Sequence, residues 1–558
     1  MEIIKKRYYL IVTFIIEFSM SLYCEPVDEL TARIVAVNFF NEYKSNSYQT
    51  SEINNIFKKE SNQICNYYIF NFKTGGFVIV SADNSAIPIL GFSFSPQSSI
   101  PTDTILWSLS FYSWMRTYEL QIEEIRKKEI SDSATYNLWK NIINNNFSNR
   151  IKSSTQVTQV GPLLESTWDQ GCYYNSTCPI MQGGPCGHAL AGCVAVAMAQ
   201  VIRYWEFPIQ NNNIDWYGYF VYSYEEMPNY LYSENWEVAH LVNLCGRSVN
   251  MDYGETSSGA YFSDVDDALE DIWKYNNSLD LKNRFWYSDN NWKNMMYSDL
   301  DNGRPILYSG GDDDARHSFV CDGYGYNDNE NYFSFNFGWN GSGDGWYTID
   351  AINPLIYSFN DEQKAIFSIK PNWTYDHILK NITIEPEQGR GFRAVNTISV
   401  AGDGTYFDIK SNEIYGGYCK LVAGDRIILK PGFQAEQRSK FHALIREART
   451  YGTYKSETVN NNIGTSNEIG IVKSVINFDN IFNIYPNPNN GEFDIEFYNN
   501  ELSDIKIEII NISGHTIYKR STNTSELLHI VIPDNEKGLY IIKIIRNQDI
   551  FIHKIIVQ

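Results

Sequence analysis

The residue best suited to covalent chemistry is Cys193, in the segment AGCVAVAMAQVIRYWEFP. Apolar residues recur after it at helical spacing, which predicts a helix that begins at Cys193. The positive end of a helix dipole favours thiolate over thiol, so we expect a lowered pKa and a nucleophilic sulfur. A lone cysteine at a helix start is more often a small buried core residue, and its interpretation therefore depends on its partners.

A thiolate that attacks a carbonyl needs a proton carrier, which is normally a histidine. His317, in RHSFVCDGYGY, begins a strand-like run 124 residues after Cys193 and is the predicted acid and base. His188 lies on the approach to the same helix as Cys193, where it is poorly placed to face the sulfur. His240, in WEVAHLVNLCG, is expected to be structural.

Two side-chain amides complete the predicted site. Asn336, in FSFNFGWNG, is expected to accept the ring N–H of His317 and fix its orientation, with Trp339 as cover. Gln170, in STWDQGCYYN, is expected to stabilise the oxyanion of a tetrahedral intermediate together with the Cys193 N–H. Without the other residues of the set, Gln170 would be interpreted as a surface glutamine. The set of four predicts acyl transfer through a cysteine nucleophile.

Composition limits the partners of the chain. Its 558 residues carry 66 acidic and 45 basic side chains, and the formal charge of −21 repels phosphates and anionic lipid heads. No segment after the N-terminus approaches the ~20 consecutive apolar residues of a membrane span. We therefore expect neither a nucleic-acid partner nor an integral membrane span.

The cysteines do not predict a cofactor. Cys172, Cys178 and Cys186 are spaced poorly for a structural zinc site, and no matching ligand pair follows them. They are close enough in sequence to hold one local disulfide, although the pairing is open. We expect no metal and no other cofactor.

The four predicted site residues lie in a central region, which is flanked by an N-terminal region and by a region beyond Pro371. The N-terminus has the charge-then-apolar order of a secretory signal. A helix is predicted over 29–43, then a hairpin that turns at Gly75-Gly76, then a helical stretch over about 108–140. Polar residues before 160 indicate an exposed boundary that a protease could cut. Beyond Pro371 short apolar strands and turns predict all-β structure.

These motifs together resemble the streptopain-like family of papain-clan cysteine proteases, over roughly 29–371. YIFNFKTGGFVIVSADNSAIPILGFS is similar to the family's inhibitory prosegment and GCVAVAMAQVIRYWEFP to its nucleophile helix. MDYGETSSGA, HSFVCDGYGY and NFGWNGSGDGWYTIDAINP resemble a cleft loop, the histidine strand and the strand that follows. The resemblance implies the same four roles: nucleophile, base, oxyanion amide and orienting amide at Cys193, His317, Gln170 and Asn336.

Two positions depart from the family pattern. The family commonly has Gly-Gly before its histidine, where this chain has Ala315-Arg316, and Phe337 replaces the first tryptophan of an Asn-Trp-Gly-Trp motif. Catalysis should survive both changes. An arginine beside the histidine would alter the cleft, so the family's specificity does not transfer directly.

The C-terminal sequence resembles a different module. YPNPNNGEF, ISGHTIY and KGLYIIKI are similar to the C-terminal sorting domain of the type IX secretion system of Gram-negative bacteria. This resemblance implies passage through the periplasm and the outer membrane by the type IX machinery, then release or attachment at the cell surface. An ordinary carbohydrate-binding or adhesive β-sandwich is the alternative.

The sequence therefore predicts a secreted cysteine endopeptidase that is made as a zymogen and acts on protein or peptide substrates, with its own prosegment as inhibitor. The alternatives are a catalytically silent adhesin or binding protein on the same fold, or a cysteine amidase or transglutaminase. The expected architecture is multidomain α+β: signal peptide 1–24, inhibitory propeptide 25–155, papain-like protease domain 156–373, small all-β module 374–450, linker 451–480 and sorting β-sandwich 481–558.

Overall fold

The computed structural model describes residues 24–44, 52–130, 132–145, 159–210, 220–310, 317–327, 330–349 and 363–449, and strands within 482–557. It divides into two compact units, 1–461 and 462–558. The predicted linker, nearly all of the predicted signal peptide, most of the expected cleavage region and Ala315-Arg316 lie outside the described residues.

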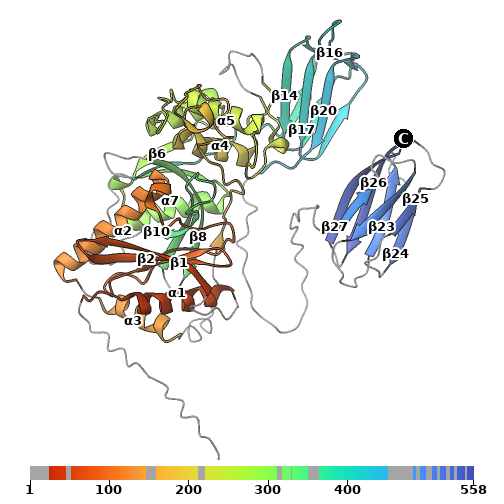
Figure 1. Cartoon of the computed structure of the whole chain (residues 1–558). Helices are drawn as coiled ribbons and strands as arrows, with labels where there is room; N and C mark the ends of the chain where they lie inside the picture. Colours follow the sequence, from red (N-terminus) through yellow and green to blue (C-terminus); the bar gives the residue numbers. More distant parts are fainter. Residues whose placement is uncertain are drawn as a thin grey trace, which may run out of the picture. The chain divides into compact units, whose positions relative to one another are not determined.

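The N-terminal part is a small sheet between helices (Figure 1). The predicted helix and hairpin are confirmed, but the helical stretch over 108–140 is two helices. Glu129 ends the first in a left-handed conformation, and the Asp132 side chain caps the second through the Thr135 N–H. The elements are α1 (Glu29–Lys44), β1 (Ile53–Ser61), β2 (Ile64–Phe72), β3 (Phe77–Ser81), β4 (Ile89–Ser93), α2 (Leu109–Lys128) and α3 (Ser133–Ile143).

Strand β2 is buried on both faces, which explains its nearly continuous apolar sequence. Tyr68 and Phe70 belong to a core shared with α1 and α3. Tyr67 and Ile69, on the opposite face, belong to a core that includes α2 and continues into the central region of the chain. The N-terminal part therefore shares one hydrophobic core with the region that carries Cys193.

The sheet is also continuous with the central region. Eleven of the described strands form one sheet, and β4 pairs antiparallel with β10 through Trp346↔Phe92 and Tyr347↔Gly91. The order is β1-β2-β3-β4-β10-β9-β8-β7-β11-β6, with β5 beside β8. The central elements are β5 (Gln159–Val160), α4 (Cys193–Trp205), α5 (Trp236–Ser248), β6 (Asp280–Asn283), α7 (Asp289–Asp301), β7 (Ile306–Gly310), β8 (His317–Asn327), β9 (Glu330–Asn336), β10 (Gly345–Thr348) and β11 (Lys364–Phe367).

Helix α2 packs on the central sheet through aromatic rings. Trp114 is 4% exposed and lies edge-on to Phe335, with ring centroids 4.7 Å apart, and to Phe319, at 6.0 Å. The Tyr118 hydroxyl donates to the backbone carbonyl of Thr348 at 2.8 Å. Such edge-to-face ring pairs add to the free energy of burial, so this helix is a main attachment of the N-terminal part.

The all-β module is a parallel β-solenoid. Each coil contributes three short strands, and each strand pairs in parallel with its equivalent in the next coil, as Figure 1 shows for β14, β17 and β20. The prediction of a small all-β module is confirmed. The strands are β12 (Asp376–Leu379), β13 (Ile382–Ile384), β14 (Gly389–Ala394), β15 (Thr397–Val400), β16 (Phe407–Ile409), β17 (Tyr418–Ala423), β18 (Arg426–Leu429), β19 (Phe433–Ala435) and β20 (Lys440–Ile445).

Ion pairs that each include a buried charge join the solenoid to the central region. Glu206 ends helix α4 and is bonded to Arg393, at 3.1 Å, and to Arg446 of the solenoid. The fully buried ammonium of Lys420 contacts both carboxylate oxygens of Glu225. Because a buried charge is stable only when paired, these contacts make the attachment specific.

The second unit is a β-sandwich. Side chains from its two sheets share one buried apolar cluster, with Ile495 and Ile530 from one sheet and Ile507 and Ile542 from the other. The predicted sandwich is therefore confirmed. One sheet has β21 (Phe482–Tyr485), β22 (Glu492–Phe497) and β25 (Leu528–Val531), and the other has β23 (Ile505–Asn511), β24 (Thr516–Thr522), β26 (Gly538–Arg546) and β27 (Asp549–Val557).

Candidate active site

Helix α4 begins at Cys193, as predicted, and Gly192 makes this start possible. Gly192 has φ +90°, a left-handed conformation that strains other residues. A Cβ there would lie 2.7 Å from the Met251 side chain. Met251 begins the predicted cleft loop, which also bonds to Leu190 through the Gly254 carbonyl at 3.0 Å. The cleft loop thus lies beside the start of the nucleophile helix.

The sulfur of Cys193 faces the histidine that the sequence indicates. Cys193 Sγ and His317 Nδ1 are 3.8 Å apart, although the two residues are distant in sequence. His317 is the first residue of β8, and the next residue, Ser318, donates its backbone N–H to Cys193 Sγ at 3.4 Å. The sulfur therefore accepts from the backbone of the strand that carries its imidazole partner.

The protonation state of Cys193 differs from the expectation based on its helix. Burial raises the pKa of the thiol, while the N–H groups of Ser318, Val194 and Cys193 itself act to lower it. Cys193 is 8% exposed, and removal from water disfavours a thiolate more than the helix end favours it. The predicted lowering of the pKa is therefore wrong for this form of the chain, which still carries its N-terminal part.

Asn336 is the last residue of β9 and is buried in an amide network. Its Nδ2 donates to the Ser166 carbonyl at 2.7 Å, and its Oδ1 accepts from Gln200 Nε2 at 2.9 Å and from the Gly338 N–H. Gln200 Oε1 in turn accepts from the Ser166 hydroxyl and the Trp168 N–H. The contact that the sequence predicts, from Asn336 to His317, is not among these bonds and stays a prediction.

Gln170 lies next to the start of α4 through its backbone. Its carbonyl accepts from the Ala191 N–H at 3.0 Å, two residues before the nucleophile. Its own N–H donates to Asp169 Oδ1 at 2.6 Å. The residue is buried, and the approach of its amide to an oxyanion at Cys193 stays a prediction.

The other two histidines considered are placed away from the sulfur. His188 Nδ1 contacts the Cys178 carbonyl at 2.9 Å, within the loop before the helix. The ring of His240 stacks on Trp236, with centroids 4.3 Å apart. A thiol facing an imidazole, with a backbone donor on the sulfur, suits nucleophilic attack followed by proton transfer, and His317 is the partner that the geometry provides.

Gln200 and Ser318 are functional candidates that the sequence reasoning missed. Gln200 is fully buried and joins α4 to β9 and to the segment before Gln170. The sequence could have indicated Gln200, because it is the one polar side chain in the apolar run CVAVAMAQVI. Ser318 acts through its backbone N–H, so no side-chain pattern could have indicated it.

Known proteins share the sequence around this site. Residues 168–347 match the Peptidase C10 family, which includes both the thiol and the imidazole. Streptopain from Streptococcus pyogenes serotype M28 is 30% identical over 349 residues, which cover 55% of this chain and 81% of streptopain. The chain belongs to the peptidase C10 family. This C10 peptidase also resembles the thiol protease/hemagglutinin PrtT of Porphyromonas gingivalis, at 25% identity over 54% of the chain and 36% of PrtT.

The flanking regions match modules of their own. Residues 24–122 match the Spi protease inhibitor and residues 483–558 the secretion system C-terminal sorting domain. A prointerpain A fragment from Prevotella intermedia is 27% identical, at a TM-score of 0.43, and covers 57% of this chain and 99% of that one. The described residues contain no helix long and apolar enough to cross a membrane. The C10 peptidase is a cysteine protease with an inhibitory prosegment and a type IX sorting domain, secreted to the cell surface or beyond.

Proposed function

We propose that Cys193 is the nucleophile of this protease and His317 its acid and base. His317 takes the proton of the Cys193 thiol, the resulting thiolate attacks the carbonyl carbon of a peptide, and the carbonyl oxygen becomes an oxyanion. Gln170 and the Cys193 N–H stabilise that charge, with each such donor worth about 10²–10³ in kcat. His317 then gives its proton to the leaving amine as the C–N bond breaks, which leaves a thioester on Cys193.

Hydrolysis of the thioester completes the cycle. His317 takes a proton from water, the oxygen attacks the thioester carbonyl, and the sulfur leaves as a thiolate. Asn336 orients the imidazole in this scheme, and Gln200 holds Asn336. The observation that supports these roles most directly is the 3.8 Å approach of Cys193 Sγ to His317 Nδ1.

The prosegment contacts the chain directly after the predicted orienting amide, Asn336. Phe111 of α2 packs against Phe337, with ring centroids 5.5 Å apart. Phe337 is the residue that follows Asn336, the predicted orienting amide. The Ser98 hydroxyl donates to the Asp344 carbonyl in the loop that follows. We propose that release of the prosegment, by cleavage within 150–160, opens this end of the site to water and allows the thiolate to form.

Three variants of the mature chain test the assignments. Cys193→Ala should abolish casein hydrolysis and alkylation by a thiol-directed protease inhibitor, His317→Ala should do nearly the same, and Gln170→Ala should lower kcat by about 10²–10³. Casein cleavage that persists in Cys193→Ala would refute the assignment. Release of the N-terminal fragment in the Cys193→Ala precursor would show that another protease performs maturation.

The same measurements separate the alternatives. A silent adhesin would leave Cys193 unlabelled and casein intact. A transglutaminase or amidase would be labelled at Cys193 and would release ammonia from glutamine side chains without cutting the chain. The domain boundaries given from the sequence stay proposals, and sequencing the N-terminus of the mature enzyme would locate the first of them.

A further inference from the structure

The chain between Gln170 and Cys193 forms a closed loop, here called the 170–191 loop. Its ends meet where the Ala191 N–H donates to the Gln170 carbonyl at 3.0 Å. One end therefore carries the proposed oxyanion amide, and the other runs into the nucleophile. The separation of these ends therefore helps to set the distance between the backbone of Gln170 and that of Cys193.

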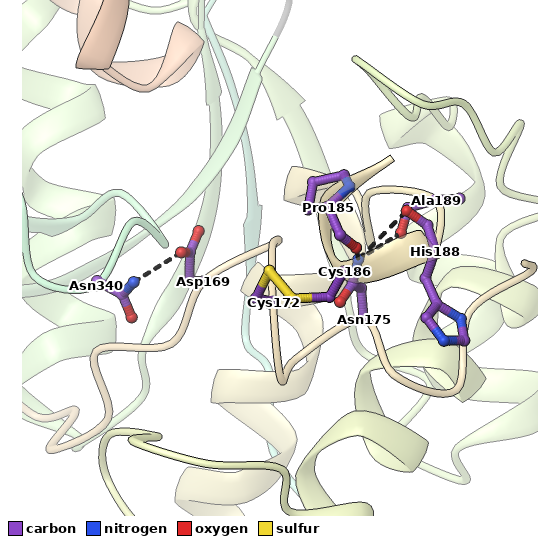
Figure 2. Close-up of a disulfide and its surroundings, with 8 residues drawn as sticks. All are labelled: Asp169, Cys172, Asn175, Pro185, Cys186, His188, Ala189 and Asn340. Carbon is purple, nitrogen blue, oxygen red and sulfur yellow. Dashed lines mark hydrogen bonds between the residues drawn. A yellow bond between two sulfur atoms is a disulfide. The ribbon is translucent and has the colours of Figure 1, made fainter. Parts of the chain in front are cut away.

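A disulfide crosses the loop next to these ends. Cys172 and Cys186 are bonded, with Cα atoms 5.4 Å apart and a sequence separation of 14 (Figure 2). Cys186 is exposed and holds a left-handed conformation at φ 53°, which is unfavourable for a residue with a Cβ. The loop would relax at Cys186 without the bridge, and a reductant in solution can reach the sulfur.

Asn175 forms a second cross-link inside the loop. Its side chain is fully buried, and Nδ2 donates to the carbonyls of Pro185 at 2.8 Å and Ala189 at 3.1 Å. Figure 2 shows the Asn175 amide beside the disulfide, with dashed bonds to carbonyls of the other arm of the loop. The disulfide and the Asn175 amide link the two arms of the loop at separate points. Together they restrain the positions of its two ends.

Asp169 ties Gln170 to the turn that follows Asn336. One carboxylate oxygen accepts the Gln170 N–H, and the other accepts from Asn340 Nδ2 at 2.7 Å. Figure 2 shows this bond beside the disulfide. The position of Gln170 thus depends on a rigid loop on one side and on the turn after Asn336 on the other.

We propose that the Cys172–Cys186 disulfide is a positioning element for catalysis, which holds the 170–191 loop closed so that Gln170 can reach the oxyanion formed at Cys193. The inference rests on the proposed function. It gives this protease two opposite redox requirements, because Cys193 must be a thiol while Cys172 and Cys186 must stay bonded. Reduction by a dithiol gives two protein thiols and closes the reagent into its own cyclic disulfide.

Mature enzyme from the full-length chain with both Cys172→Ser and Cys186→Ser tests the proposal. We expect kcat on a fluorogenic peptide to fall by at least about tenfold, towards the loss of one oxyanion donor, while KM changes by less than about twofold. Binding of a peptide aldehyde, which forms an oxyanion-like adduct, should weaken in parallel. Alkylation of Cys193 by iodoacetamide forms no oxyanion, so its rate should stay within about twofold.

Two controls keep the test specific. Gln182→Ala changes an exposed residue of the same loop and should leave all three measurements unchanged. In the wild-type enzyme dithiothreitol should lower kcat as thiols appear at Cys172 and Cys186, and reoxidation should restore kcat. The double-serine variant should show no such loss with dithiothreitol.

Unchanged kcat in the double variant would overturn the proposal, as would an equal fall in alkylation and aldehyde binding, since that pattern means a general loss of structure. Either result leaves the proposed function intact as long as Cys193→Ala is inactive. Activity in Cys193→Ala would instead overturn the proposed function itself.

Discussion

Trp114→Ala in the precursor should release the protease from its prosegment. The indole is almost fully buried, and it contacts Phe335 and Phe319 of the central sheet and the Tyr118 hydroxyl of its own helix. Truncation of a buried Trp to Ala costs about 3–5 kcal/mol. Because one of these contacts is internal to the prosegment, we assign about 2–4 kcal/mol of the loss to its attachment, which is a factor of about 30–1000 in the open population.

The assay is the initial rate of peptide hydrolysis by uncleaved precursor, with processing followed on a gel. The rate should rise by that factor until it approaches the rate of the mature enzyme. Glu124→Ala, which removes an exposed i,i+4 ion pair on the same helix, is the matched control and should change the rate less than about threefold. A Trp114→Ala precursor as quiet as the wild type would refute the view that α2 is a main attachment.

Three further predictions concern buried polar groups. Gln200→Leu leaves Asn336 and Ser166 short of hydrogen bonds, so it should cost about 1–3 kcal/mol of unfolding free energy and lower kcat more than it changes KM, measured by urea titration and steady-state kinetics. Burial raises the pKa of Asp344 to about 8, so the folded chain holds a proton that the unfolded chain releases near pH 4. The precursor therefore loses stability as pH rises from about 4 to 8. Asp344→Asn should remove this part of the dependence of Tm on pH, and equal Tm slopes in the two proteins would contradict the prediction. Glu206→Gln removes the partner of the buried Arg393 and of the partly exposed Arg446, and it should destabilise the solenoid attachment by about 3–5 kcal/mol, whereas Lys380→Ala, in an exposed pair, should leave the same thermal melt nearly unchanged.

Local structure could be predicted from the sequence where one physical signal dominated. The helix that starts at Cys193 and the hairpin at Gly75-Gly76 followed from apolar spacing and turn residues, and both are confirmed. The break in the helical stretch near Asp132 was missed, although Asp132 is a common capping residue, because the apolar pattern runs on across it.

Long-range relations were beyond the sequence. Alternating strands do not reveal whether they pair in parallel, so the solenoid was predicted only as all-β. The pairing of Gly91 with Tyr347 joins residues that no local pattern connects. The pKa of Cys193 depends on what surrounds the sulfur in three dimensions, and burial proved larger there than the helix end. Among the site residues, the approach of His317 to Cys193 could be expected from the residue types. The hydrogen-bond network around Gln200 could not, because it joins segments that are distant in sequence.

The seam between β4 and β10 has a consequence for the protein after activation. Only two register pairs join the strands, and a side chain on Gly91 would collide with the Tyr347 ring at 2.6 Å. Removal of the prosegment would turn β10 from an interior strand into an edge strand of the sheet and would expose Trp346 and Tyr347 to solvent. Unpaired rims invite association with other sheets, and the four-residue length of β10 limits that hazard. As long as the prosegment stays in place, β4 covers this edge of the sheet.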